Sequence, residues 1–490
     1  MSTQANPTRV LVLGCGSVAQ CVIPLLIRDL KIATSSITIV DFVDNRHRVA
    51  DAIKQGVKYE IGQVTRENLD SFLAERLAAG DILLDLAWNI DCPTILEWCR
   101  MRGVRYLNTS VELWDPYYDM AKTHPLDRTL YVRHQSIRKM VAKWGSNKGP
   151  SAVVEHGANP GLVSHFAKQA LFEISNKILN DGRAGSRQSA IESALASESF
   201  DRLAMLTGTR VIHISERDTQ ITNQPKEVNE FVNTWSVEGF YEEGVAPAEM
   251  GWGTHERWMP ANAQVHADDG PCNQICLAQP GMETWVRSWV PSGEILGMII
   301  RHGESYTMSN HLTVRDDSGK AIYRPTVHYS YCPSNEAINS VLELRMRNWQ
   351  KQPKERIMNN EIISGRDELG VLLLGHDYTG WWTGTRLSID EARSIVVGQS
   401  ATTLQVAGSV IAAVKWMIAS PNEGVCVPDD LPWKSVLADA RPYIGEIHSA
   451  PTDWDPLKTR NDLFPGFGNT GRLDTTDPWQ FRNFLTPTPS

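Results

Sequence analysis

The sequence predicts an α/β protein with a doubly wound parallel sheet and, after it, an α+β domain with a largely antiparallel sheet. From residue 9 to about residue 155, short apolar strands alternate with amphipathic helices, which is typical of parallel strands joined by crossover helices. From about Arg183 the pattern changes: after one more helix, strand-like runs follow one another without intervening helices, which favours antiparallel pairing. We therefore expect a doubly wound domain at 1–160, an α+β substrate domain at 161–388, helices at 389–420 that return to the first domain, and an irregular tail at 421–490.

The strands of the first region are short apolar runs, and the segments between them have helical periodicity. Val10–Leu13 is wholly apolar, as expected of a strand that is buried on both faces of a parallel sheet. Further strands are expected at 37–40, 57–61, 82–86, 106–108 and 152–154. Helices are expected at 46–55, 66–78, 94–101 and 130–144. Ligands of such sheets bind beyond the carboxyl ends of the strands, so the residues that follow each strand are candidates for a site.

A glycine-rich turn follows the first strand. Its sequence, GCGSVA at residues 14–19, is the G-x-G-x-x-A form of the dinucleotide fingerprint. Gly14 permits the tight turn, Gly16 lets the backbone approach a pyrophosphate, and Ala19 keeps the following helix close to the strand. Ser17 and Val18 open that helix, whose free N–H groups and dipole attract phosphate. The turn predicts a Rossmann domain that binds its cofactor at these five residues.

An acidic residue closes the second strand. Asp41 stands where a carboxylate can bind a ribose 2′-hydroxyl and would repel a 2′-phosphate, which favours NAD over NADP. Arg46 and Arg48 follow closely and could hold such a phosphate, so NADP remains an alternative. Asn89 and Thr109 follow the fourth and fifth strands, and we expect both to contact the cofactor.

Composition excludes several classes of protein. The net charge of −9 argues against nucleic acid or an anionic membrane as a partner and is compatible with a cationic substrate. The polar segment 1–8 is neither a signal peptide nor an anchor, and no apolar run approaches the length of a membrane span. The eight cysteines form no C-x-x-C framework and no Cys/His metal spacing. We expect a cytoplasmic protein with reduced thiols and no metal.

The chain after the sixth expected strand also contains helical and strand-like patterns. A long helix is expected from Pro160, with Asn159 as its cap, to about residue 180, and another at 190–206. Strands are expected at 209–215, 230–240, 284–290, 293–301 and 323–331. The helical pattern returns at 389–420, where 402–418 is long and apolar. After Pro421 the chain is rich in Pro, Gly, Asp and Trp, and no internal repeats occur.

Acidic residues beside aromatic or histidine residues recur through the chain. These segments are 111–114, 213–216, 234–238, 241–243 and 302–304. An ammonium group is bound by carboxylates through charge-assisted hydrogen bonds and by an aromatic face through a cation–π contact. Taken singly, each such acid is more often solvated and each tryptophan more often part of a core. Arginines are interleaved with them, so an amino acid substrate is not excluded, and His213, His302 and His328 are candidate proton carriers.

Longer motifs carry a resemblance to a known family. HGANPG, HISERDTQ, FVNTWSVEGF, GWGTHERW, RHGES, RDELGVLLLGH, TDWDPL and DTTDPWQFRN resemble, in this order and spacing, the bacterial homospermidine synthases of the saccharopine-dehydrogenase-like group. The resemblance runs from the glycine turn almost to the C-terminus. It implies that two putrescines, or spermidine plus putrescine, are joined into homospermidine with release of ammonia. It also implies a bound NAD that oxidises one amine to an imine and later reduces the Schiff base, and it implies a homodimer.

The resemblance also assigns site residues. It places Glu216 and Glu304 at the substrate ammonium groups and gives Trp235 the cation–π face. Five further residues would line the pocket or its entrance: Glu112, Asn159, Glu243, His302 and Asp367. Glu216, Glu304 and His302 are the candidates for positioning and proton transfer, without a division of roles. Two departures lie in the first domain, where Ala19 replaces a common glycine and Asn89 stands where relatives are expected to have an acid.

Two other functions remain open from the residues. One is a saccharopine- or carboxynorspermidine-type reductase that consumes NAD(P)H in net turnover. The other is a non-catalytic protein that binds NAD and polyamines. The combination of Glu216, Trp235 and Glu304 argues against the second. Product formation from putrescine with catalytic NAD distinguishes all three.

Overall fold

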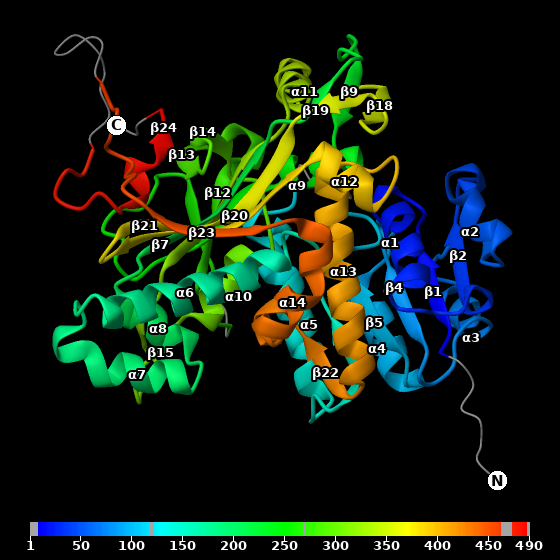
Figure 1. Ribbon diagram of the computed structural model, residues 1–490, viewed down its shortest axis with the longest axis horizontal. Coiled ribbons are helices and arrows are strands. Elements are labelled where there is room, and N and C mark those ends of the chain that lie inside the picture. The colour runs from blue at the N-terminus through cyan, green and yellow to red at the C-terminus, as the bar shows by residue number, and fades with distance from the viewer. Residues whose placement is uncertain (1–7, 117–121, 268–269, 462–472, 488–490) are drawn as a thin grey trace. The chain divides into compact units, whose positions relative to one another are not determined.

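The computed structural model describes residues 8–116, 122–267, 270–461 and 473–487 (Figure 1). The chain forms two compact units. The first comprises residues 1–122, 133–162 and 390–444, and the second comprises 123–132, 163–389 and 445–490. The segment 1–7, expected to be neither signal peptide nor anchor, lies outside the described residues.

The first unit is built on a seven-stranded sheet in which every described pair of strands is parallel. The strand order is β22-β6-β5-β4-β1-β2-β3, which contains the arrangement of a doubly wound nucleotide-binding sheet. The strands are β1 (Val10–Leu13), β2 (Ile37–Asp41), β3 (Lys58–Ile61), β4 (Ile82–Asp85), β5 (Arg105–Asn108), β6 (Gly149–Val153) and β22 (Glu423–Cys426). The predicted fold class is confirmed here.

Helices cover this sheet. They are α1 (Ser17–Arg28), α2 (Ala50–Lys54), α3 (Leu69–Ala74), α4 (Cys92–Arg102), α5 (Leu130–Lys143), α12 (Ile389–Ile395), α13 (Ala401–Ala419) and α14 (Trp433–Ile444). α13 packs against α1 and α14, and Gly408 permits the close approach because a Cβ there would lie 2.7 Å from the Cβ of Tyr443. By length and composition α13 could cross a membrane, contrary to the expectation that no run approaches such a length. Its most apolar window is 78% buried inside the protein, which is typical of a core helix.

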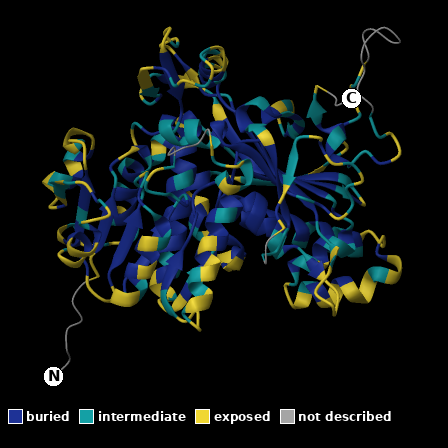
Figure 2. Ribbon diagram, turned by 180° about the vertical axis from the view of Figure 1, so that it is seen from behind, coloured by how far each residue is buried: buried dark blue, intermediate teal, exposed yellow. Residues whose placement is uncertain are grey.

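The second unit is built on a mixed sheet of eleven strands, which contains the order β11-β12-β10-β17-β7-β20-β21-β23. β7 (Val211–Asp218) pairs in parallel with β17 (Thr326–Cys332) and antiparallel with β20 (Arg366–His376), and the other described pairs of this sheet are antiparallel. Its remaining strands are β10 (Pro247–Gly251), β11 (Ala263–Val265), β12 (Gln274–Pro280), β13 (Trp285–Val290), β14 (Gly293–Met298), β21 (Thr379–Ser388), β23 (Ile447–Thr452) and β24 (Leu485–Thr486). The α+β prediction is confirmed. Figure 2 shows the strands of both sheets mostly buried and the exposed residues on outer helices and loops.

Smaller elements complete the second unit. Its helices are α6 (Leu162–Asn180), α7 (Gln188–Ala196), α8 (Phe200–Thr207), α9 (Val237–Val245), α10 (Glu304–His311) and α11 (Asn335–Met346). Three two-stranded sheets pair β8 (Ile221–Thr222) with β19 (Ile362–Ser364), β9 (Glu230–Asn233) with β18 (Lys354–Ile357), and β15 (Val314–Arg315) with β16 (Ala321–Tyr323).

Further sequence expectations differ from the structure, and one of them is the start of the long helix, because α6 begins at Leu162 and not at Pro160 with Asn159 as its cap. The strand expected at 230–240 ends at Asn233, because the Ser236 side chain caps α9 by accepting from the Gly239 N–H at 3.0 Å. The helix expected at 190–206 is two helices, separated where Glu198 adopts a φ of 50°. The tail expected to be irregular contributes β22 and α14 to the first unit and β23 to the second, although 462–472 and 488–490 lie outside the described residues.

Candidate active site

The glycine turn joins β1 to α1 in the first unit. Gly14 has a φ of 84°, and a Cβ there would lie 2.8 Å from the Leu86 carbonyl oxygen, so only glycine fits. Gly16 is exposed, and a Cβ there would meet no atom within 4 Å. Ser17, half-buried Val18 and fully buried Ala19 follow in the first turn of α1. The turn therefore leaves its backbone open at Gly16, beside the helix N-terminus, as the dinucleotide fingerprint requires.

Asp41 ties the end of β2 to this turn. Its Oδ2 accepts from the Cys15 N–H at 2.6 Å, and its Oδ1 accepts from the Val43 N–H at 2.9 Å. Burial, followed by the charge of Asp41, raises the pKa of the Cys15 thiol to about 12, so this cysteine remains a thiol. Arg46 forms an ion pair with Asp44 at 2.5 Å, so Asp44 already neutralises one of the two arginines that could have held a 2′-phosphate.

Two aromatic residues lie at this edge of the sheet: Phe42, which sequence reasoning missed, and Trp88, which is among the candidate residues after the fourth expected strand. Phe42 follows β2 and is 55% exposed, and Trp88 follows β4 and is 46% exposed. Their ring centroids lie 6.4 Å apart in an edge-to-face arrangement. Both residues follow strands that flank β1, namely β2 and β4, and their exposure was the available signal because this edge of the sheet is where ligands bind.

Asn89 and Glu112 meet at the carboxyl edge of β4 and β5. Asn89 has a φ of 59°, and its N–H donates to Glu112 Oε2 at 3.4 Å. Glu112 Oε1 accepts from the Ser110 hydroxyl at 2.6 Å. Thr109 is half-buried at the end of β5, and Asn159 is half-buried in the turn after β6. The structure thus brings Glu112 and Asn89 together and places Thr109 and Asn159 at the ends of neighbouring strands.

A second pair in the first unit joins Glu155, which is in the candidate segment after the sixth expected strand, to His134, which the sequence analysis did not single out. Glu155 follows β6, is 2% exposed and has a φ of 60°, which is strained for a non-glycine residue. Its Oε2 lies 2.8 Å from Nε2 of His134, and its N–H donates to Asn108 Oδ1 at 2.7 Å. Burial and strain at the ligand edge of a parallel sheet mark this residue as part of the site's framework.

A cluster of buried carboxylates occupies one region of the second unit. Glu216 on β7 is 2% exposed, and Glu304 at the start of α10 and Asp367 on β20 are 0% exposed. Asp367 pairs in register with Asp218, and alternation along β7 puts Asp218 and Glu216 on the same face. Burial raises the pKa of Asp218. Buried carboxylates in such number require cationic or hydrogen-bonding partners.

His302 lies between two of the acids. Its Nε2 is 3.0 Å from Glu243 Oε2, and its Nδ1 is 3.3 Å from Glu304 Oε1. Burial alone would lower the pKa of His302, but the charges of Glu243 and Glu304 outweigh it and raise that pKa well above the usual value. The imidazole is therefore held as a cation that has a proton to give.

Trp235 stands beside this cluster on the segment between β9 and α9. Its indole N–H donates to the Tyr331 hydroxyl at 2.8 Å. Its ring centroid lies 5.6 Å from that of Phe240 and 6.5 Å from that of Tyr331. The structure thus brings together five residues that the resemblance had assigned to one site: Glu216, Trp235, Glu243, Glu304 and His302. Neighbouring Tyr329 also belongs here, because its hydroxyl donates to Glu216 Oε2.

Two of the candidate proton carriers lie away from this cluster. His213 and His328 are in register on β7 and β17, one position out of phase with Glu216 and Tyr329, so they face the opposite side of the sheet. Their ring centroids are 4.2 Å apart, and His213 Nδ1 lies 2.9 Å from the Ser288 hydroxyl. Burial lowers the pKa of His328 to about 4 and that of His213 well below its usual value. Both are structural side chains of the core.

The arginines offer little to a substrate carboxylate. Arg301 is buried and paired with Glu242, and Arg287 forms an ion pair with Glu294 at 2.9 Å. Arg324 donates to the Trp252 carbonyl oxygen at 2.7 Å, and Arg257 lies 3.5 Å from Asp477. Within the described residues, these four arginines already have carboxylate or carbonyl partners, whereas Arg217 donates to the Cys332 sulfur and the Pro333 carbonyl oxygen.

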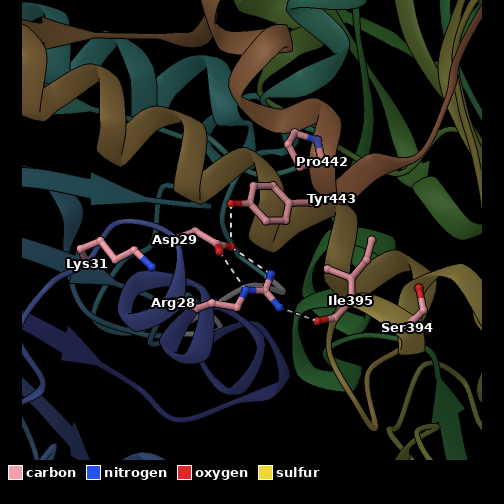
Figure 3. Close-up of a pocket in the computed structure, with 7 residues that line it drawn as sticks. All are labelled: Arg28, Asp29, Lys31, Ser394, Ile395, Pro442 and Tyr443. Atoms are coloured by element: carbon pink, nitrogen blue, oxygen red, sulfur yellow. Dashed lines mark hydrogen bonds and ion pairs between the residues drawn. The ribbon is translucent and has the colours of Figure 1, made fainter.

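A separate hollow lies on the first unit (Figure 3). It is lined by Arg28, Asp29, Lys31, Ser394, Ile395, Pro442 and Tyr443. Asp29 accepts from Arg28 Nε and from the Tyr443 hydroxyl, both at 2.8 Å. Arg28 also donates to the Ile395 carbonyl oxygen at 2.9 Å. The hollow lies at the C-terminal end of α1, whereas the glycine turn lies at its N-terminal end, so it is not part of the cofactor site.

The parallel sheet with its glycine turn and the second unit with its mixed sheet define a dinucleotide-binding enzyme of two units. Family models agree with this class. The saccharopine dehydrogenase NADP binding domain matches residues 10–153, and the saccharopine dehydrogenase C-terminal domain matches residues 157–452.

Full-length relatives narrow the class. The chain is 40% identical to the homospermidine synthase of Blastochloris viridis over 481 residues, which covers 97% of both chains. It is 38% identical to that of Mesorhizobium japonicum over 481 residues, covering 97% of this chain and 96% of the relative. The crystal structure of homospermidine synthase from Legionella pneumophila in complex with NAD matches with a TM-score of 0.85 and 36% identity, covering 98% of this chain and 97% of that one. The chain therefore belongs to the homospermidine synthase family and is an enzyme of this type.

Proposed function

We propose that this enzyme joins two putrescine molecules into homospermidine with release of ammonia, through an imine and a Schiff base, while a tightly bound NAD is reduced and reoxidised. Spermidine can replace one putrescine as the aminobutyl donor, with diaminopropane leaving in place of ammonia. A new carbon–nitrogen bond forms and gives a secondary amine, and the overall reaction involves no net oxidation. The known activity of the relatives supports this proposal.

The observation that carries the proposal is the group of buried carboxylates beside Trp235 in the second unit. Glu216 and Glu304 are almost fully buried and lie in the same network as the indole and His302. Carboxylates bind ammonium groups by charge-assisted hydrogen bonds, and an indole face stabilises a cation by about 2 kcal/mol when it is desolvated. An alkyl diammonium ion fits this chemistry at both ends.

The first unit fits NAD. The open backbone at Gly16 and the N-terminus of α1, opening with Ser17 and Val18, would hold the pyrophosphate, and Asp41 would bind the ribose 2′-hydroxyl. Phe42 and Trp88 would flank the adenine, and Asn89 and Thr109 would contact the cofactor further along the edge of the sheet. NAD bound there supplies a hydride acceptor for the amine and, after reduction, a hydride donor for the Schiff base.

The residues of the second unit have distinct tasks in this scheme. Glu216 and Glu304 hold the substrate ammonium groups, and Trp235 stabilises the cationic carbon–nitrogen intermediates through its ring. His302, held protonated by Glu243 and Glu304, carries the proton that accompanies the departure of ammonia. Glu112, Asn159 and Asp367 guide the diamine at the pocket or its entrance.

We also propose the location, the oligomeric state and the partners of this enzyme. We expect a cytoplasmic homodimer in polyamine biosynthesis, with diamines as its partners and without nucleic acid or membrane. The net charge of −9 supports the preference for cationic ligands.

The direct experiment incubates purified protein with putrescine and a catalytic amount of NAD. We expect homospermidine and ammonia by mass spectrometry and chemical assay, and no accumulation of NADH in solution. Stoichiometric turnover of NAD(P)H would instead establish a reductase of the saccharopine or carboxynorspermidine type. NAD and putrescine binding without any product would establish a non-catalytic binding protein.

A further inference from the structure

Two tyrosines on β17 lie on the same face of the sheet as Glu216. Tyr329 and Tyr331 are two residues apart, and Tyr331 is in register with Glu216 on the parallel neighbour β7. Tyr329 is 2% and Tyr331 0% exposed. Their rings stack, with centroids 5.2 Å apart and an interplanar angle of 17°. The pair is therefore a rigid surface in direct contact with the acid cluster.

Tyr329 contacts two residues of the candidate site. Its hydroxyl donates to Glu216 Oε2, and its ring lies edge-to-face with the His302 ring at a centroid distance of 4.3 Å. Burial, and then the charge of Glu216, raises the pKa of Tyr329 well above its usual value, so the phenol keeps its proton and remains a donor. A donor to the charged form of a carboxylate favours that form. Tyr329 thus holds the Glu216 carboxylate in one orientation.

Tyr331 contacts Trp235, the third residue of the candidate site that this pair of tyrosines touches. Its hydroxyl accepts from the Trp235 indole N–H at 2.8 Å, and its ring packs at 5.5 Å from Phe240, which in turn lies 5.6 Å from Trp235. Trp235 stands on a short segment between β9 and the N-cap of α9, so its backbone alone does not fix the plane of its ring. The hydrogen bond and the packing against Phe240 set that plane.

We propose that Tyr329 and Tyr331 are positioning residues that hold the Glu216 carboxylate and the Trp235 indole at a fixed separation as one ammonium-binding unit. The proposal rests on the proposed function, because it presumes that Glu216 and Trp235 bind the diamine. A cation that contacts both groups needs them in place before it arrives, since any reordering on binding would reduce affinity. The stacked phenols supply this order through two hydrogen bonds to neighbouring side chains.

The first experiment measures Tyr329→Phe with wild-type protein as reference. Hydrogen bonds to charged groups are the stronger ones, so we expect KM for putrescine to rise about 10-fold or more, with a smaller change in kcat and unchanged affinity for NAD. The matched control is Tyr323→Phe, which removes a hydroxyl of the same unit that donates to the Thr209 carbonyl oxygen at 2.6 Å. We expect that control to change KM less than about 2-fold.

The second experiment is a double-mutant cycle of Tyr331→Phe and Trp235→Phe. Trp235→Phe keeps an aromatic ring but removes the N–H that donates to the Tyr331 hydroxyl, so we expect turnover to remain measurable. We expect Tyr331→Phe to lower kcat/KM about 5-fold in the wild-type background and less than about 2-fold in the Trp235→Phe background. Equal effects in both backgrounds would overturn the positioning role of Tyr331.

The outcomes separate this proposal from the proposed function. Wild-type protein that makes no homospermidine would refute the proposed function, and the tyrosine proposal with it. Active wild-type protein whose KM responds to Tyr329→Phe no more than to Tyr323→Phe would overturn the tyrosine proposal alone. Thermal unfolding of each variant identifies a loss of folding, because a general destabilisation would lower kcat and NAD affinity together with substrate affinity.

Discussion

Individual residues define what the second unit can bind. Acidic and aromatic residues occur at many places in the sequence. Their residue types alone do not show which of them form an ammonium-binding site. The structure selects among them by burial and contact: Glu216 and Glu304 are buried beside His302 and Trp235, whereas His213 and His328 face a closed core. The proposed selectivity for a cation therefore rests on a few desolvated side chains.

Replacement of Trp235 tests the cation–π contact. We expect Trp235→Glu to lower kcat at least about 30-fold, since the lost ring interaction is worth about 2 kcal/mol and a further carboxylate enters an acidic region. NAD affinity, measured by fluorescence titration, should stay within 2-fold or so of wild type because the glycine turn is in the other unit. Turnover at the wild-type rate would show that the indole does not stabilise the cationic intermediates.

The raised pKa of His302 makes a prediction about stability and pH. A group whose folded pKa is raised stabilises the folded state fully below its unfolded pKa of about 6.5, and this contribution is lost as the pH rises through the folded pKa. We therefore expect Tm of wild type to exceed that of His302→Gln most at about pH 6, with the difference shrinking toward alkaline pH. A difference that grows with pH would mean that His302 is neutral in the folded protein.

Secondary-structure elements explain which parts of the fold could be predicted from sequence. β1, β2 and β4 are apolar runs followed by turn residues, so local patterns were sufficient to find them. The break after Asn233 was missed because Phe231 and Val232 continue into further apolar residues, while the Ser236 cap is a single side-chain hydrogen bond. β22 was missed because its partner, β6, lies far away in sequence. Tyr329 and Tyr331 were missed for the same reason, since tyrosines on a strand are ordinary core residues until β7 is placed beside them.

The β1–α1 turn can be tested by exchanging one glycine. Gly16→Ala meets no atom within 4 Å and has an ordinary φ of −73°, so we expect its free energy of unfolding to change by less than about 1 kcal/mol. NAD affinity should fall about 10-fold or more, because the methyl group occupies the space where the pyrophosphate approaches.

A matched variant should behave in the opposite way. Gly145 has a φ of 70° and open space around it, so Gly145→Ala should cost about 1 kcal/mol of stability and leave NAD affinity unchanged. If the two variants lost NAD affinity equally, the glycine turn would not be the cofactor site.

At the scale of the whole molecule, the residues proposed to bind the cofactor and those proposed to hold the substrate ammonium groups belong to different units. The first provides the glycine turn and Asp41, and the second provides the carboxylates, His302 and Trp235. The fingerprint alone is typical of dehydrogenases that release reduced cofactor. Membership of the homospermidine synthase family, together with the proposed ammonium-binding role of the second unit, favours a transferase instead, in which a hydride is taken from one diamine and returned to the product.

The most direct test of this account follows the hydride itself. Purified protein with catalytic NAD is given putrescine deuterated on the carbons next to nitrogen, in the presence of excess unlabelled NADH. If the same hydride returns within one turnover, homospermidine retains every deuterium, as read by mass spectrometry. Homospermidine in which one deuterium is replaced by hydrogen from the NADH in solution would contradict this return of the hydride.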